Sequence, residues 1–99
     1  MEKHTFEIKE TVIVRNEKIE VTFPHFRKYE FFSYKVLNKD MQIQVSYYPH
    51  EVERLNTASI SHEQICIPNT FRKGSYEITE EEFNETFLRA IQLINNQKN

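Results

Sequence analysis

The chain has 99 residues, with 13 basic and 15 acidic side chains and a net charge of -2. This length suits one hydrophobic core, so we expect residues 1–99 to form a single domain. The near-neutral charge excludes a global positive field of the kind that attracts nucleic acid or an anionic membrane.

Cys66 is the single cysteine, which excludes an internal disulfide and favours a reducing compartment. No segment approaches the ~20 apolar residues of a membrane span, and the N-terminal residues do not resemble a signal peptide. We therefore expect a soluble, cytoplasmic protein without a membrane partner. No motif in the chain identifies a known family.

Gly74 is the single glycine, which argues against glycine-rich phosphate or dinucleotide loops. Turns should instead use asparagine, the next best residue for positive φ. Four asparagines fall between apolar runs, namely Asn16, Asn38, Asn56 and Asn69.

Apolar and polar residues alternate over 6–14 and again over 19–23, which predicts two half-buried strands. The apolar positions are even-numbered in the first strand and odd-numbered in the second. Directly opposite residues of an antiparallel pair share a face, so the loop between the strands must hold an even number of residues. A two-residue turn at 16–17 would place Val14 opposite Ile19.

A second hairpin is predicted from residues 32–36 and 41–47, joined to the first by a connector at 24–28. Val36 would lie opposite Ile43 across a two-residue loop, or opposite Met41 across a four-residue loop. Both alternatives keep the apolar residues on one face, and we prefer neither.

The middle of the chain is harder to interpret. Residues 49–55 fit either a short helical turn or a loop. Residues 58–67 predict a fifth strand, in which the apolar pattern shifts between Ile60 and Ile65, and a β-bulge near His62 would explain the shift.

Residues 80–95 carry clear helix signals. Thr79 suits the N-cap position, and Glu82 three residues later completes a capping box. Ile78 and Phe83 can close over this turn as a hydrophobic staple. One helical face is apolar, flanked by Leu88, and is formed by Phe83, Phe87, Ala90, Ile91 and Ile94. The chain as a whole predicts an α+β fold, with an antiparallel sheet of about five strands (two N-terminal hairpins plus one further strand) packed on a single C-terminal helix.

His62, Glu63 and Cys66 have the spacing of a zinc-binding helix in which the second histidine is replaced by cysteine. The isoleucine-rich surroundings favour a strand, on which residues four apart lie ~13 Å apart, too far for one metal. A Cys66 nucleophile would lack both an orienting acid and an oxyanion loop. We therefore expect no catalytic residue, no metal site, no cofactor and a buried, structural Cys66.

Eight of the 13 aromatic residues fall within residues 23–48, interleaved with basic residues. Several follow the buried pattern of their strands, but others do not. The aromatic residues that depart from the buried pattern, together with neighbouring residues, form the candidate partner-binding surface. It consists of His25, Phe26, Arg27, Lys28, Tyr29, Phe31 and Tyr48. Aromatic rings beside basic groups can also stack on unpaired bases, so binding of single-stranded nucleic acid through residues 23–48 is the alternative.

One helix is narrow compared with the expected sheet. Five strands ~4.8 Å apart make a sheet roughly 20–24 Å wide, while one helix covers about 10 Å of it. Unless the sheet curls strongly around the helix, the remaining apolar surface needs a second subunit or another partner. We therefore expect a small, non-enzymatic protein-interaction or adaptor module, and a homodimer in particular.

Overall fold

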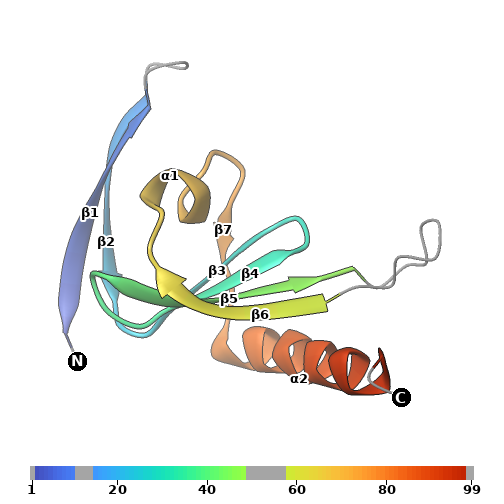
Figure 1. Cartoon of the computed structure of the whole chain (residues 1–99). Helices are drawn as coiled ribbons and strands as arrows, with labels where there is room; N and C mark the ends of the chain where they lie inside the picture. The colour runs from blue at the N-terminus through green and yellow to red at the C-terminus, as the bar shows by residue number, and fades with distance from the viewer. Residues whose placement is uncertain (1, 11–14, 49–57, 98–99) are drawn as a thin grey trace.

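A computed structural model describes residues 2–10, 15–48 and 58–97, and the structural statements below concern these residues. They form seven strands and two helices (Figure 1). The strands are β1 (Lys3–Glu10), β2 (Arg15–Thr22), β3 (His25–Tyr29), β4 (Phe32–Val36), β5 (Met41–Tyr47), β6 (Ala58–Gln64) and β7 (Tyr76–Glu77). The helices are α1 (Ile67–Thr70) and α2 (Glu80–Gln97). The predicted α+β class, with an antiparallel sheet packed on a C-terminal helix, is confirmed.

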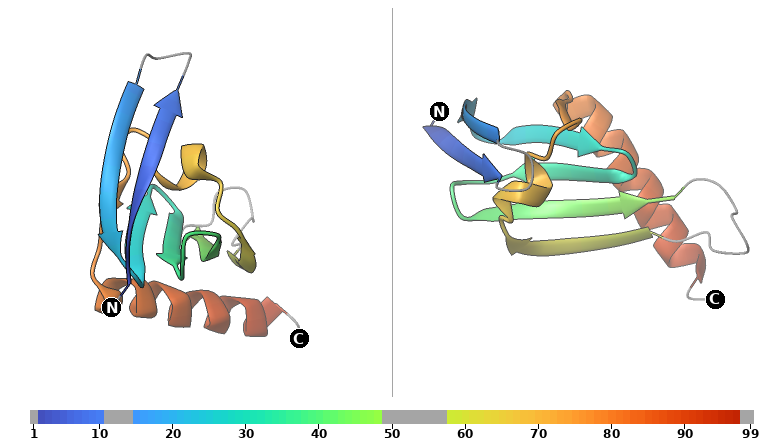
Figure 2. Two further views of the ribbon diagram at one scale, coloured as in Figure 1. Left: turned by 90° about the vertical axis from the view of Figure 1, so that its left-hand side faces the viewer. Right: turned by 90° about the horizontal axis from the view of Figure 1, so that it is seen from above.

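The main sheet has five strands in the order β6-β5-β4-β3-β7, and each strand is antiparallel to its neighbours. It differs from the predicted sheet because β1 and β2 form a separate two-stranded sheet across one end of it (Figures 1 and 2). The expected connector at 24–28 lies largely in β3. This strand escaped prediction because its first two residues, His25 and Phe26, are both buried and therefore show no apolar alternation.

The pairing of β1 with β2 places Phe6 opposite Ile19, and Asn16 lies within β2 opposite Lys9. The predicted turn at residues 16–17 is therefore wrong, and positions 11–14 lie outside the described residues. Both registers pair even with odd positions, so the alternation alone does not distinguish them. The observed register is the one that brings Phe6 into a core shared with the main sheet.

In the β4–β5 hairpin, Val36 lies opposite Gln42. Both predicted registers, with Val36 opposite Ile43 or Met41, are wrong. They assume that only one face of the sheet is apolar. In the structure the apolar residues of β4 and β5 point to opposite faces, because different elements of the chain cover each face.

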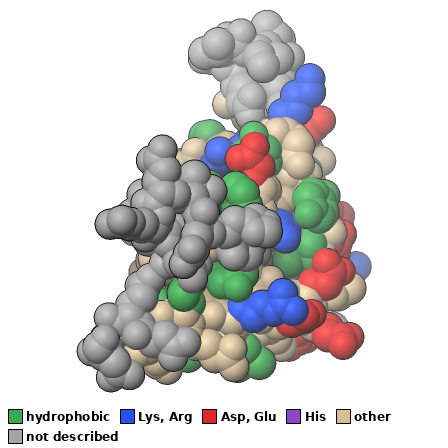
Figure 3. Space-filling model, turned by 90° about the vertical axis from the view of Figure 1, so that its right-hand side faces the viewer, with side chains coloured by type: hydrophobic (Ala, Val, Ile, Leu, Met, Phe, Trp, Pro, Cys, Tyr) green, Lys and Arg blue, Asp and Glu red, His purple; other side chains and the backbone are tan. Residues whose placement is uncertain are grey.

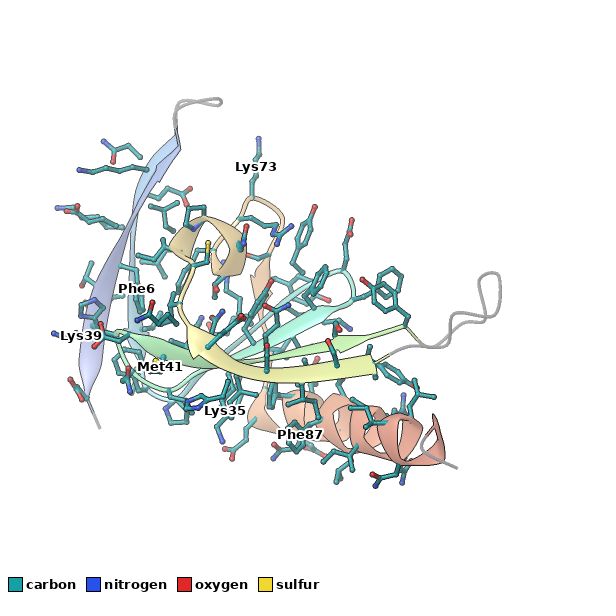
Figure 4. All side chains as sticks on the ribbon, in the orientation of Figure 1. Phe6, Lys35, Lys39, Met41, Lys73 and Phe87 are labelled. Carbon is teal, nitrogen blue, oxygen red and sulfur yellow. The ribbon has the colours of Figure 1, made fainter. Side chains whose placement is uncertain are left out.

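The main sheet separates two hydrophobic cores. Helix α2 crosses beneath one face (Figure 2), and the helix-side core consists of Phe26, Val45, Ile78, Phe83 and Ala90. The β1–β2 hairpin and α1 lie on the other face, where the hairpin-side core consists of Phe6, Ile8, Val21, Phe23, Val36 and Phe71. Figure 4 shows Phe6 and Phe87 on opposite sides of the sheet. Much of the apolar surface that was expected to need a partner is thus covered by the chain's own hairpin.

A polar contact joins α1 to the main sheet. Gln42 is 1% exposed, and its Oε1 accepts a hydrogen bond from the Thr70 hydroxyl at 2.7 Å. Its Nε2 donates to Glu63 Oε1 at 3.2 Å. Because both ends of the amide are bonded, a glutamine is tolerated at this buried position.

Helix α2 begins where predicted and ends two residues later than expected. The N–H of Glu82 donates to Thr79 Oγ1 at 3.1 Å, and the Thr79 hydroxyl donates to Glu82 Oε1 at 3.3 Å. Ile78 and Phe83 both belong to the helix-side core, as the staple requires. The predicted start and capping residue of the helix are therefore confirmed, and Phe83, Phe87 and Ala90 of the predicted apolar face pack in the helix-side core.

Strand β6 is shorter and more regular than predicted. It pairs with β5 without interruption, so the bulge expected near His62 is wrong. The N–H of Ile65 donates to the carbonyl of Asp40 at 2.8 Å, and Ile65 packs against the hairpin-side core. The shift in apolar pattern after Ile60 therefore marks the end of the strand.

Asparagine does not supply positive φ in the described residues. Among these residues, the non-glycine residue with a positive φ is Glu30, at 50°, which lies between β3 and β4. Asn16 lies in β2 and Asn69 in α1. Asn38 stabilises its turn through its side chain, whose Oδ1 accepts two backbone N–H groups at 2.8 and 2.9 Å. Residues 49–56, with the remaining asparagine and the segment predicted as helix or loop, lie outside the described residues.

Candidate functional site

The predicted partner-binding residues of β3 are divided between the two faces of the main sheet. His25, Arg27 and Tyr29 point to the hairpin side, while Phe26 and Lys28 point to the helix side. Phe26 is 7% exposed within the helix-side core. Strand β3 by itself therefore does not present these five residues as one surface.

His25 and Arg27 take part in packing on the hairpin side. The His25 ring stacks on Phe71 with 5.9 Å between centroids, and its Nε2 has no hydrogen-bond partner within the described part of the chain. Burial lowers the pKa of His25, Arg27 acts in the same direction, and Glu77 opposes them. Arg27 Nε donates to Ser75 Oγ at 2.8 Å. These contacts hold the loop before β7 against the sheet.

Other predicted residues gather where β3 turns into β4. The ring centroid of Tyr48 lies 4.9 Å from that of Phe31 and 6.4 Å from that of Phe32. The guanidinium carbon of Arg72 lies 4.4 Å from the ring centroid of Tyr29 and 5.9 Å from that of Phe32. We call the five residues Tyr29, Phe31, Phe32, Tyr48 and Arg72 the aromatic tip.

The aromatic tip is partly open to solvent. Phe31 is 44% exposed, and the other four members are half-buried. On the side of the molecule shown in Figure 3, hydrophobic side chains reach the surface between basic and acidic groups. Because Phe31 rests on a second ring, the tip presents a supported apolar surface rather than an isolated hydrophobic residue.

Two members of the aromatic tip, Phe32 and Arg72, are not among the predicted site residues. Phe32 follows the buried pattern of its strand, and Arg72 is distant in sequence. Arg72 reaches Tyr29 because the chain passes close to that ring at Gly74, where φ is 96° and an added Cβ would lie 3.3 Å from Tyr29 Cε2. The single glycine of the chain was therefore the available signal for this contact.

His62 is exposed on β6, and Cys66 is exposed at the N-cap of α1. The predicted burial of Cys66 is wrong, because the strand ends before it. Within residues 2–10, 15–48 and 58–97, no three His, Cys, Asp or Glu side chains form a group that could hold a metal ion. In the same residues, no helix combines the length and the apolar composition needed to cross a membrane.

No family model, curated protein or solved structure matches this chain. Large hydrophobic side chains are exposed at three described positions, Phe31, Tyr76 and Leu88. Phe31 differs from the other two because it belongs to a cluster of aromatic rings.

Proposed function

We propose that this protein is a small, non-enzymatic protein-interaction module that acts as a homodimer, with the aromatic tip as its contact surface. The observation that carries the proposal is the exposed ring of Phe31, supported by Tyr48 at 4.9 Å. Aromatic side chains contribute strongly to interfaces because they bury a large area at a low cost in conformational entropy. The surface expected to meet a partner thus shifts from the sheet face to the end of the β3–β4 hairpin.

The charges of this region suit a second copy of the chain. Glu30 is exposed in the turn beside Phe31, and Arg72 borders the rings from the other side. In a two-fold dimer the same patch meets itself. An acidic and a basic group can then pair across the axis while the aromatic rings stack at its centre.

Light scattering at micromolar concentration tests this proposal. The parent chain should be a dimer, and Phe31→Ser should be a monomer because the ring at the centre of the contact is lost. Leu88→Ser is the matched control, since Leu88 is 59% exposed on α2 and should not contribute to the contact. A monomeric parent, or a Phe31→Ser variant that still dimerises, contradicts the proposal.

The cytoplasm is the compartment that we propose for this module. Cys66 is exposed, and the chain contains no second cysteine with which it could form an internal disulfide. An exposed single thiol persists most readily where thiols are kept reduced.

Single-stranded nucleic acid is a second candidate partner, favoured by one observation. Arg72 lies over the ring of Tyr29 at 4.4 Å, so the aromatic tip combines stacking rings with a guanidinium group. Retention of a labelled single-stranded oligonucleotide by the parent and by Arg72→Gln tests this candidate. Absence of binding at low salt eliminates it, whereas salt-sensitive binding that is lost in Arg72→Gln favours it over the homodimer.

A further inference from the structure

A cavity of about 220 Å³ lies between the β3–β4 hairpin and helix α2. Residues of three strands and the helix line it, including Lys28, Ser33, Tyr47, Thr86 and Arg89. The volume is below the ~300 Å³ at which most pockets for organic ligands begin, so an occupant has to be small.

An unpaired buried hydroxyl belongs to the wall of this cavity. Ser33 is 1% exposed, and its Oγ has no hydrogen-bond partner among the described residues. Ser33 lies opposite Lys28 on β3 and Val45 on β5, so its side chain points to the face that α2 covers. Buried hydroxyls are normally hydrogen-bonded, and a ligand group in the cavity would supply the missing partner.

Basic side chains reach the same cavity from two elements. Lys28 comes from β3 and is half-buried, and its ammonium group forms no ion pair with another described residue. Arg89 comes from α2, where one guanidinium nitrogen contacts Glu85 Oε1 at 2.7 Å. An arginine has five N–H donors, so this bond leaves others available for a ligand. Glu30 adds one acidic group to the wall, and its charge opposes an anion, so binding must come from the two basic side chains and the Ser33 hydroxyl.

We propose that this cavity binds a phosphate group, either as inorganic phosphate or as the head of a small phosphomonoester. The Lys28 ammonium, the Arg89 guanidinium and the Ser33 hydroxyl would each donate to a phosphate oxygen. Charge-assisted hydrogen bonds from three elements match an anion with several acceptor oxygens. The site lies on the helix side of the sheet, and its wall also includes Glu30 and Phe31, which belong to the proposed homodimer contact.

Titration of the ¹⁵N-labelled chain with inorganic phosphate, at ionic strength held constant with sodium chloride, tests the proposal. Saturable shifts should appear at the amides of Lys28, Ser33 and Arg89. A parallel titration with phenyl phosphate distinguishes the two sources, because tighter binding of this ester identifies a phosphomonoester site. Linear, unsaturable shifts with both probes, or shifts spread over all exposed lysines, overturn the proposal.

Lys28→Met keeps the aliphatic stem and should weaken phosphate binding roughly tenfold or more, because a charge-assisted hydrogen bond is lost. Lys35→Met is the matched control. Lys35 lies on the helix side of the same sheet (Figure 4), but it does not line the cavity, and its variant should bind phosphate like the parent. Equal weakening in both variants would show a diffuse charge effect and overturn the proposal.

Ser33→Ala separates ligand binding from a structural role of the hydroxyl. Without phosphate, this variant should melt at the same temperature as the parent or higher, since Oγ has no described partner to lose. With phosphate, it should gain less thermal stability than the parent does. A lower melting temperature without phosphate, or an equal gain with it, contradicts the assignment of this hydroxyl to the site.

Discussion

His25 is a buried ionisable side chain whose protonation state is coupled to folding. The ring is 6% exposed and stacks on Phe71. Burial, assisted by Arg27 and partly opposed by Glu77, lowers the pKa of His25 below its usual value of 6.5. In the window between that lowered pKa and 6.5, the unfolded chain binds this proton more readily than the folded chain. The free energy of unfolding therefore has its full value above pH 6.5, where His25 is neutral in both states. It decreases as the pH falls from 6.5 through the folded-state pKa of His25.

His25→Phe should reduce this loss of stability in acid while keeping a ring against Phe71. Urea denaturation on either side of pH 6.5 measures the free energy of unfolding of parent and variant. His62→Gln serves as the control, because His62 is exposed and its replacement should leave the acid sensitivity unchanged. If His25→Phe loses as much stability in acid as the parent, the pH dependence arises from other groups.

Single residues also show why the candidate site was only partly predictable. Tyr29, Phe31 and Tyr48 fit a simple core pattern poorly, and all three belong to the aromatic tip. Phe26 fits the same pattern equally poorly, yet it lies in the helix-side core. A residue that departs from the pattern of one face can be exposed, or it can be buried on the opposite face, and the sequence does not distinguish these outcomes.

Helix α2 is the element whose start can be tested most directly. Thr79→Ala removes the oxygen that accepts the N–H of Glu82 at 3.1 Å. Loss of such a cap should lower the free energy of unfolding by about 1 kcal/mol. Thr79→Ser keeps the acceptor and should stay within roughly 0.5 kcal/mol of the parent. Chemical denaturation compares the three proteins, and an equal loss in both variants would show that the methyl group matters rather than the hydrogen bond.

The strands were predictable as elements but not as pairs. Alternation located the segments that became β1, β2, β4, β5 and β6. Their registers depend on which side chains must face the same core, and alternation allows several even shifts of equal quality. For β4 and β5, alternation predicted that the apolar residues share one face. They do not, because Gln42 rather than Ile43 lies opposite Val36.

At the scale of the molecule, the main sheet separates the helix-side core from the hairpin-side core in the part of the chain that the structure describes. The radius of gyration is 14.6 Å, compared with roughly 13 Å for a typical domain of about 100 residues. The β1–β2 hairpin contributes to this extended shape, since it lies across one end of the main sheet (Figure 1). Contacts on the hairpin side and on the helix side should therefore be separable by mutation.

Phe6→Ala should loosen the β1–β2 hairpin more than helix α2. Phe6 is 2% exposed in the hairpin-side core, and truncating a buried phenylalanine typically costs about 3–5 kcal/mol. Hydrogen exchange should show lost protection in β1 and β2 with protection largely retained in α2. Phe83→Ala, also 2% exposed but in the helix-side core, should give the opposite pattern. Uniform loss of protection in both variants would show that the cores open as one cooperative unit.

The amino-acid sequence by itself determined the elements of this protein whose signals are local. Helix α2, its Thr79 cap and its staple follow from neighbouring residues, as does the α+β class. Tertiary structure decided the hairpin registers, the separation of β1 and β2 from the main sheet, and the approach of Arg72 to Tyr29. The physical reason is that the two-residue period of a strand shows which residues share a face. Only packing against distant segments decides which core that face joins, or whether it is exposed to solvent.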